Sequence, residues 1–226
     1  MKNLIYILLA VFTISCSSTK SIQFSQKEND IFTNQNLKDF LATHKSPKVV
    51  LRVPLSSGNV TEKDENSYLY NAIENELLSS GFVVRDRQLF NQIIENNENN
   101  LDYEVLKQKS DTELIIELSQ LKHDILYETN KFLDGKGNEK IESYTTHKKY
   151  GAMVEYKVII VENNQYAGVY RFNYTPCTEP CMVSFPLNDA HKRRKEKPVA
   201  YEYVEKDEME EFIRYATKQL VVEMRR

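Results

Sequence analysis

The chain of 226 residues is long enough for one good-sized domain, or for one domain with appendages. Its 41% hydrophobic and 28% charged residues exclude a fully disordered protein, and the six Gly and six Pro exclude collagen-like or Pro-rich sequence. The 30 Lys and Arg against 33 Asp and Glu give a net charge of −3, so we do not expect nucleic acid as a partner.

The N-terminus has the pattern of a bacterial secretory signal followed by a lipidated cysteine. A positive start at Lys2 precedes an apolar run over residues 4–14, which is shorter than the ~20 residues of a membrane-spanning helix. Cys16 follows where cleavage is expected and resembles the cysteine of the lipobox, although Thr13 stands where leucine is usual. We therefore expect a signal peptide over residues 1–15 and a lipid anchor on Cys16. An ordinary signal peptide, or a buried helix with a chance cysteine, is the alternative.

Residues 16–46 are expected to comprise the lipidated cysteine and a polar tether, with a short helix near residues 36–41. The second mature residue, Ser17, is not Asp. By resemblance to the Gram-negative sorting rule, this favours the outer membrane over the inner one. No acidic run follows Cys16. We expect the protein to be lipid-anchored at the periplasmic face of the outer membrane.

The next part of the chain predicts a strand, a helix and a second strand. Residues 48–54 form a β-branched run that is typical of a strand. An amphipathic helix is expected from Asn66 or Ser67, and Gly81 can end it in a left-handed conformation. Residues 82–84 predict a second short strand. The apolar face of the helix is expected to consist of Leu69, Ala72, Ile73 and Leu77.

A second amphipathic helix is expected after Asp86. A short helix over residues 101–106 then leads to a third strand over residues 113–118. The apolar face of the second helix is expected to consist of Leu89, Phe90, Ile93 and Ile94.

The second half of the chain changes to the alternation of antiparallel strands. Residues 152–161 and 166–174 flank a turn at residues 162–164 and predict a hairpin. Residues 127–150 are polar around a turn at residues 134–138, which indicates a long hairpin excursion from the sheet. The core face of the later hairpin is expected to hold Ala152, Val154, Tyr156, Val158, Ile160, Tyr166, Gly168, Tyr170, Phe172 and Tyr174.

The chain closes with an amphipathic helix over residues 208–226. Acidic residues open it and Arg225 and Arg226 end it, which suits the helix dipole. Together the elements predict an α/β (α+β) fold, with a single mixed β-sheet, helices packed on its faces, a late antiparallel hairpin and a C-terminal helix. We expect residues 47–226 to form one periplasmic domain.

This order of elements resembles a known family. It is similar to the periplasmic core of the curli secretion channel (CsgG) family and its relatives, the LpoB-type activators of peptidoglycan synthases and the N-terminal domain of TolB. Asp86, Arg87 and Glu95 match charged positions of that pattern, whereas Thr112 replaces an Ala-type residue and Arg85 is an extra charge. The resemblance implies a fold and an envelope setting, and fold alone does not fix function. The segments that carry it are residues 49–54 (VVLRVP), 81–87 (GFVVRDR), 93–95 (IIE) and 111–116 (DTELII).

Two cysteines follow the aromatic hairpin, at Cys177 and Cys181. Once Cys16 carries lipid, they are the two remaining thiols, and an exported protein is in an oxidising compartment. With Pro180 turning the chain, three intervening residues can bring the Cα atoms within ~5.5 Å, so a disulfide that closes a loop is expected. A metal pair lacks nearby Cys or His to complete four ligands, and a redox pair is more usually Cys-x-x-Cys at a helix start.

One dense run of positive charge stands near the end of the second half. A solvated loop is the simplest interpretation of it. The functional alternative is an electrostatic contact with anionic lipid headgroups or an acidic partner, in which each residue contributes ~1 kcal/mol near an anionic membrane. The residues of this run are Lys192, Arg193, Arg194, Lys195 and Lys197.

The sequence offers little for catalysis. It contains no Gly-x-Ser-x-Gly, phosphate-binding loop or Gly-x-Gly-x-x-Gly motif. Asp86 and Glu95 are nine residues apart, and Arg87 is expected to pair with one of them or to cap the helix rather than leave a hydrolytic carboxylate pair. We expect no enzymatic activity, no metal and no cofactor.

Two functions remain open. The first is a lipid-anchored periplasmic binding or assembly module for an envelope or secretion complex, with an envelope protein or a second copy as partner. The alternative is a subunit of an oligomeric outer-membrane secretion channel of the curli type. A channel subunit needs strands of ~9–11 residues with a lipid-facing apolar side. The segments 152–161 and 166–174 alternate in this way, but a core sheet requires the same pattern.

Overall fold

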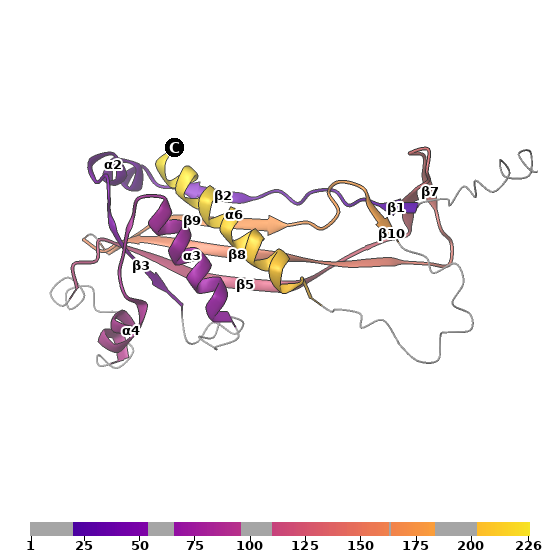
Figure 1. Cartoon of the computed structure of the whole chain (residues 1–226). Coiled ribbons are helices and arrows are strands. Elements are labelled where there is room, and N and C mark those ends of the chain that lie inside the picture. The colour runs from indigo at the N-terminus through magenta and orange to yellow at the C-terminus, as the bar shows by residue number, and fades with distance from the viewer. Residues whose placement is uncertain (1–19, 54–65, 96–109, 163, 184–202) are drawn as a thin grey trace, which may run out of the picture. The chain divides into compact units, whose positions relative to one another are not determined.

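A computed structural model of the chain forms two compact units, which are described separately (Figure 1). The large unit comprises residues 26–127, 150–176 and 200–226, and the small unit comprises residues 1–25, 128–149 and 177–199. Within these ranges the structure describes residues 20–53, 66–95, 110–162, 164–183 and 203–226.

A six-stranded mixed sheet is the basis of the large unit. Its strands are β2 (Asp30–Thr33), β3 (Lys48–Arg52), β4 (Val83–Val84), β5 (Leu114–Thr129), β8 (His147–Ile160) and β9 (Gln165–Tyr174). They are ordered β2-β9-β8-β5-β3-β4. β3 pairs in parallel with β4 and β5, whereas β9 pairs antiparallel with β8 and β2. The predicted mixed sheet and its late hairpin are therefore confirmed.

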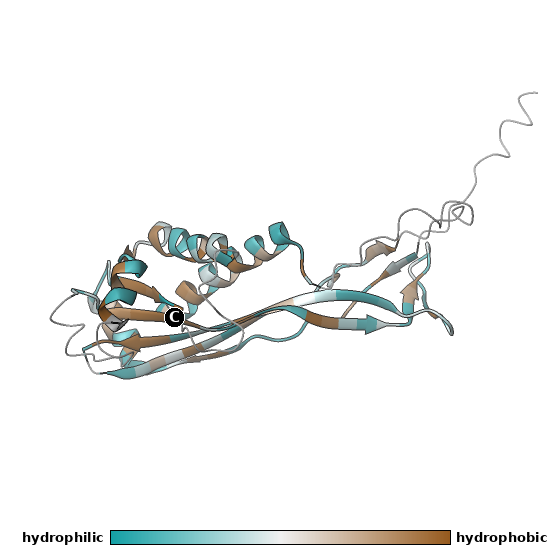
Figure 2. Ribbon diagram, turned by 90° about the horizontal axis from the view of Figure 1, so that it is seen from below, coloured by the Kyte–Doolittle hydropathy of each residue, from teal (hydrophilic) through white to brown (hydrophobic). Residues whose placement is uncertain are grey.

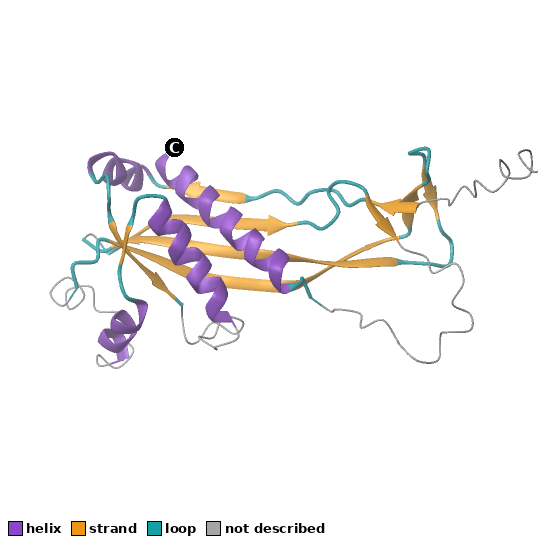
Figure 3. Ribbon diagram, in the orientation of Figure 1, coloured by secondary structure: helices purple, strands orange, loops and turns teal. Residues whose placement is uncertain are grey.

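Two long helices, α3 (Ser67–Ser79) and α6 (Lys206–Arg225), lie side by side on one face of this sheet (Figure 3). The apolar face predicted for the first helix is buried, and so is the apolar stripe of α6. Both pack on alternate strand residues such as Val49, Leu51 and Tyr156 in the main core. Gly81 follows α3 with φ of +88°, the left-handed end that the sequence predicted.

The shorter helices are α2 (Gln35–Thr43) and α4 (Arg87–Glu95). α4 contributes Phe90 to a second, smaller cluster with Val50 and Ile115, which alternate with main-core residues along β3 and β5. Because neighbouring strand residues point to opposite faces, α4 covers part of the sheet face opposite α3 and α6. Phe90 lies on the buried face of this helix, as expected. The expectation that Leu89 also lies on that face was wrong, because the Leu89 side chain is exposed.

Tyr166 also departs from its expected place. The register between β8 and β9 shifts at Val158 and Ile159, so that Val158 lies opposite Gly168 while Ile159 lies opposite Tyr166. The extra residue, Ala167, turns Tyr166 away from the main core and leaves it 61% exposed. Such a shift cannot be read from alternation alone, since a bulge changes which face each later residue takes.

The small unit contains a second sheet, which the sequence did not predict. It consists of β1 (Lys20–Ile22), β6 (Lys131–Leu133), β7 (Glu139–Ile141) and β10 (Cys181–Val183), in the antiparallel order β10-β1-β6-β7. The turn expected at residues 134–138 joins β6 to β7. The Asp134 carboxylate accepts hydrogen bonds from the backbone amides of Lys136 and Asn138, which fixes this turn.

Part of the stretch expected to be a tether is folded. Between residues 20 and 43 the chain forms β1, β2 and α2, of which only the helix was expected. β2 is held at the sheet by a chain of hydroxyl groups, in which Thr33 lies 2.9 Å from the Tyr170 hydroxyl and donates to the Glu223 carbonyl at 3.2 Å. These strands are three and four residues long and bury few side chains, so the sequence carries almost no periodic signal for them.

Candidate functional site

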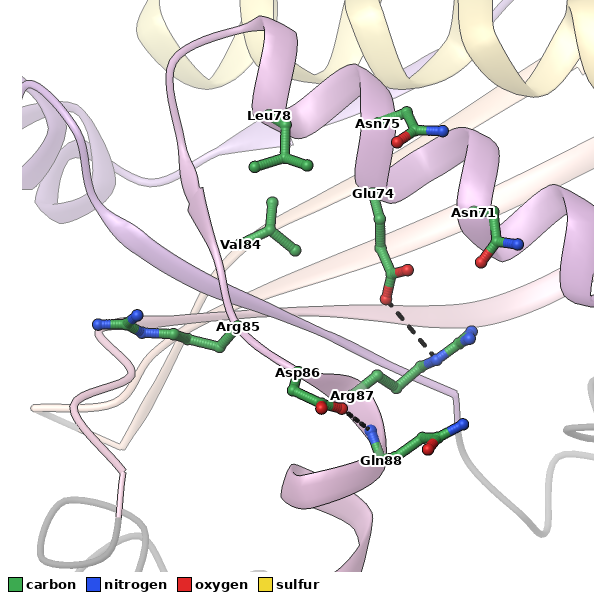
Figure 4. A pocket seen from close by; sticks show the side chains of 9 residues that line it. All are labelled: Asn71, Glu74, Asn75, Leu78, Val84, Arg85, Asp86, Arg87 and Gln88. Atoms are coloured by element: carbon green, nitrogen blue, oxygen red, sulfur yellow. Dashed lines mark hydrogen bonds and ion pairs between the residues drawn. The ribbon is translucent and has the colours of Figure 1, made fainter.

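A polar cavity of about 700 Å³ lies in the large unit, between α3 and the chain that runs from β4 into α4 (Figure 4). Side chains of α3 form one wall, and the residues around the start of α4 form the other. The lining residues are Asn71, Glu74, Asn75, Leu78, Val84, Arg85, Asp86, Arg87 and Gln88.

The charged side chains of this cavity are engaged with one another or with neighbours. Arg87 forms an ion pair with Glu74 of α3 at 3.7 Å, and its guanidinium lies 4.9 Å from the centre of the Tyr70 ring. The sequence predicted that Arg87 pairs with Asp86 or Glu95 or caps the helix, and Glu74 was not among the expected partners. The pairing joins two consecutive helices, α3 and α4, so no spacing within one helix could have revealed it.

Asp86 and Arg85 have structural partners as well. The Asp86 carboxylate accepts hydrogen bonds from the backbone amides of Gln88 at 2.7 Å and Leu89 at 3.2 Å, so Asp86 caps the start of α4. Arg85 forms an ion pair with Asp111, which also contacts Lys48 at 2.7 Å. Hydrogen bonds from Lys48 and Arg85 hold the pKa of Asp111 below its usual value.

The cavity therefore presents two arginines and two carboxylates that balance in charge. Asn71, Asn75 and Gln88 add amide groups that can both donate and accept hydrogen bonds. Such a lining suits a small neutral polar group better than an anion or a metal ion. Within the described residues, no group of three or more His, Cys, Asp and Glu side chains could hold a metal ion.

A second candidate is the open face, by which we mean the side of β2, β9 and β8 opposite α3 and α6. Both long helices lie on the other side of the sheet (Figure 2). Strand register aligns Phe32 with Val169 and Lys157 in one row across this face. Phe32 belongs to the edge strand β2 and is 63% exposed. A single exposed hydrophobic side chain is normal on a protein surface, so it is the position of Phe32 on an edge strand that makes it a candidate contact residue.

The neighbouring row of the open face is charged. Asp30, Arg171 and Glu155 lie opposite one another on β2, β9 and β8. Arg171 donates to one Glu155 oxygen through Nε at 3.1 Å and Nη2 at 2.6 Å, and Ser119 donates to the other oxygen at 2.7 Å. Burial alone raises the pKa of Glu155, but the hydrogen bonds from Ser119 and Arg171 outweigh it and hold that pKa below its usual value. Glu155 is therefore a buried, ionised carboxylate with its partners in place.

The expected disulfide is present in the small unit, where Cys177 and Cys181 are bonded with their Cα atoms 5.4 Å apart. The loop that it closes is attached to the chain after β1. The Cys177 carbonyl accepts a hydrogen bond from the Phe24 amide at 3.1 Å, and the Thr178 carbonyl accepts one from the Gln23 side chain at 2.8 Å. The bond thus closes a loop that holds the N-terminal strand in the small sheet.

Other predicted site residues lie outside the described residues. These are the lipidation site Cys16 and the whole basic run of Lys192, Arg193, Arg194, Lys195 and Lys197. None of the helices in the described ranges has both the length and the hydropathy that crossing a membrane would require. Phe32 could not be predicted to be a surface contact residue, because it is an isolated aromatic residue in a mostly polar stretch.

Comparisons with known proteins give little similarity. The chain matches no protein-family model and no curated protein, so the resemblance to the curli secretion channel family stays a prediction. A solved structure of a PelC variant from Paraburkholderia phytofirmans, a dodecamer, is similar over 88% of this chain and 98% of the PelC chain. Its sequence identity is 9% and its TM-score is 0.43. A similarity of this size carries no argument about function.

Proposed function

We propose that the protein is a lipid-anchored component of the bacterial cell envelope, held at the periplasmic face of the outer membrane. It acts as a binding and assembly module for an envelope or secretion complex and has no enzymatic activity of its own. The observation that carries the binding role is the exposure of Phe32 on the edge strand β2, whereas the anchor rests on the sequence pattern that ends at Cys16.

An edge strand offers a partner two kinds of contact at once. Among the described residues β2 has a neighbouring strand, β9, on one side only. A strand of a partner protein can pair with the backbone on the other side, while its side chains pack on Phe32. Strand addition of this kind is a common mode of assembly between proteins, and it needs no catalytic group.

The charged row beside Phe32 can orient a partner strand that binds to β2. Arg171 is bound to Glu155 but also lies 3.7 Å from Asp30, which is at the open edge. A partner strand that approaches β2 therefore meets an acidic side chain next to an aromatic one. Charges at the margin of an interface contribute mainly to specificity and to the rate of association, whereas the aromatic side chain supplies most of the affinity.

Site-specific photo-crosslinking in intact cells tests this function. A photoreactive phenylalanine analogue replaces Phe32, and the matched control places the same analogue at Tyr215, an exposed aromatic residue of α6. We expect position 32 to crosslink to one envelope protein, or to a second copy of this chain, that position 215 does not reach. The absence of any adduct at position 32, or the same adducts from both positions, would contradict the proposal.

The same experiment separates the two candidate functions. An adduct with a different envelope protein supports the assembly module. An adduct with a second copy, together with a large ring in size-exclusion chromatography of the detergent-extracted protein, supports a channel subunit instead.

The anchor is tested separately. Replacing Cys16→Ser should move the protein from the membrane fraction to the soluble fraction. Membrane association that does not change would place the anchor elsewhere in the chain.

A further inference from the structure

The folded part of the chain begins very close to the expected lipid anchor. Only residues 17–19 separate Cys16 from Lys20, the first residue of β1. Four residues span at most ~14 Å when fully extended, whatever conformation they take. If Cys16 carries lipid, as the proposed function holds, then the small unit lies within that distance of the membrane surface. The structure therefore raises the question of which side of the small sheet the lipid meets.

Strand register places three apolar side chains on one face of the small sheet, together with Ser21, Lys131 and Glu139. Ser21 of β1 lies opposite both Met182 and Leu133, and Lys131 lies opposite Ile141. Because alternate residues share a face, Met182, Leu133 and Ile141 all point to the same side, which we call the Met182–Ile141 face. Met182 is 75% exposed and Ile141 is 65% exposed. Figure 2 colours the ribbon by hydropathy and shows hydrophobic residues on the strands of this sheet.

The opposite face of the small sheet has a different character. Ile22 points to that side and is buried. Lys20 shares the side with Ile22, and its ammonium lies 4.5 Å from the centre of the Phe132 ring and 3.1 Å from a Glu142 oxygen. On the described strands of the small sheet, the two strongly exposed apolar side chains, Met182 and Ile141, therefore lie on the same face.

Tyr144 adds an exposed aromatic side chain to the small unit, three residues after Ile141. It follows β7 and is fully exposed. A tyrosine has an apolar ring and a polar hydroxyl, a combination that favours the boundary between lipid headgroups and acyl chains. On the Met182–Ile141 face itself, Lys131 and Glu139 form an ion pair of 2.9 Å, so the polar side chains there neutralise one another.

The described residues of the small unit are close to neutral. They hold six Lys and Arg against five Asp and Glu, so the apolar side chains, rather than charge, distinguish this unit.

We propose that the small unit docks on the phospholipid surface that holds Cys16, with the Met182–Ile141 face and Tyr144 in the interfacial region of the bilayer. The acyl anchor then works together with a protein surface.

The absence of Trp from the chain allows a direct test with single-tryptophan variants. The mature protein is prepared without its natural lipid, and Cys16 is coupled to a maleimide phospholipid in vesicles that contain phosphatidylglycerol. Tyr144→Trp reports on the proposed surface. Tyr166→Trp, an exposed aromatic of the large unit, is the matched control. The readouts are the emission maximum and quenching by brominated acyl chains.

We expect Tyr144→Trp to shift to the blue and to be quenched at least about twofold more than Tyr166→Trp. Equal quenching at the two positions, or no quenching at position 144, overturns the proposal. A blue shift that depends on protein concentration without vesicles also overturns it, because a second copy then covers the surface. The coupling makes this result independent of whether cells lipidate Cys16, which mass analysis of the native protein decides separately.

Two further variants divide the apolar contribution from the charged one. Ile141→Ser with Met182→Ser should lower vesicle binding of the uncoupled protein about tenfold, with no change in its dependence on salt. Lys192→Glu with Arg193→Glu and Arg194→Glu should instead remove the salt-dependent part of the binding. Binding that neither variant weakens would show that the small unit has no affinity of its own for lipid.

Discussion

The phenol of Tyr156 and the hydroxyl of Thr217 form a hydrogen bond of 3.0 Å in the main core, between β8 and α6. Thr217 donates its own hydrogen to the Ile213 carbonyl at 2.8 Å, so Tyr156 is the donor in the bond between them. Both side chains are fully buried, and burial raises the pKa of the Tyr156 phenol far above its usual value. The phenol therefore stays a donor at any physiological pH.

The direction of this hydrogen bond predicts an asymmetry between two substitutions. Tyr156→Phe removes the donor and leaves Thr217 with its bond to Ile213, so it should cost about 1 kcal/mol of unfolding free energy. Thr217→Val leaves the Tyr156 hydroxyl buried without an acceptor, which should cost about 1–3 kcal/mol. The double variant should cost less than the sum of the two. Urea unfolding measures all three, and a larger loss for Tyr156→Phe than for Thr217→Val would contradict the assignment of the donor.

The parts of the fold that the sequence predicted are those with dense apolar periodicity. In α3, Leu69, Ile73 and Leu77 recur at helical spacing and all are buried. β1 could not be predicted in the same way, because Ile22 is its only apolar residue. Its identity as a strand comes from pairing with β10 and β6, which lie far away along the chain. Pairing at such distances leaves no local pattern.

The same distinction between local patterns and long-range pairing applies to the candidate site. The disulfide between Cys177 and Cys181 was predictable, since both partners are close in sequence. The bond of Arg171 to Glu155 depends on the register of two strands, and the exposure of Phe32 depends on β2 being an edge. Both are properties of the assembled sheet. A sequence pattern predicts which residues form a strand but not which strands lie beside it.

The buried Glu155 predicts a pH dependence of stability. Its pKa is lower in the folded state than in the unfolded chain, so its contribution is present above the unfolded pKa and is lost as the pH falls through the folded pKa. Between about pH 5 and pH 3, the unfolding free energy of Glu155→Gln should therefore fall less steeply than that of the parent. Chemical unfolding at each pH measures the slope.

The partner of Glu155 provides the control for that measurement. Arg171→Gln leaves the buried carboxylate without its bidentate donor and should be less stable than Glu155→Gln at neutral pH. If the parent and Glu155→Gln lose stability in parallel on acidification, the carboxylate is not ionised in the folded state.

Gly151 of β8 lies where a side chain has no room. A Cβ atom at this position would meet the Tyr174 carbonyl oxygen, and it would lie 2.6 Å from Tyr127 Cε2 and 3.1 Å from Pro176 Cδ. Gly151→Ala should therefore lower the unfolding free energy by about 1–3 kcal/mol. The control is Gly137→Asn, in an open turn with φ of +81°, where asparagine tolerates the left-handed conformation. Equal thermal stability of Gly151→Ala and the parent would show that β8 and β9 can move apart at this position without loss of unfolding free energy.

The disulfide should stabilise the small sheet through β1. It closes a loop of five residues. The conformational entropy that this loop removes from the unfolded chain corresponds to about 2 kcal/mol of stability. The loop also holds the Phe24 amide at the Cys177 carbonyl, and Cys181 lies opposite Ile22 in the pairing of β10 with β1. Without the bond, the loop gains freedom and both contacts weaken together. The double substitution Cys177→Ser with Cys181→Ser should therefore loosen β1 first.

Hydrogen exchange resolves this effect residue by residue. The amides of β1 and β10 should exchange faster in the double variant, while the amides of β3 and β5 in the six-stranded sheet keep the protection they have in the parent. Reduction of the parent with dithiothreitol should reproduce the change, because it opens the same loop without altering a side chain. Equal loss of protection in both sheets would mean that the disulfide stabilises the chain as a whole. Unchanged protection in β1 would mean that pairing with β6 and the burial of Ile22 are sufficient to hold the N-terminal strand.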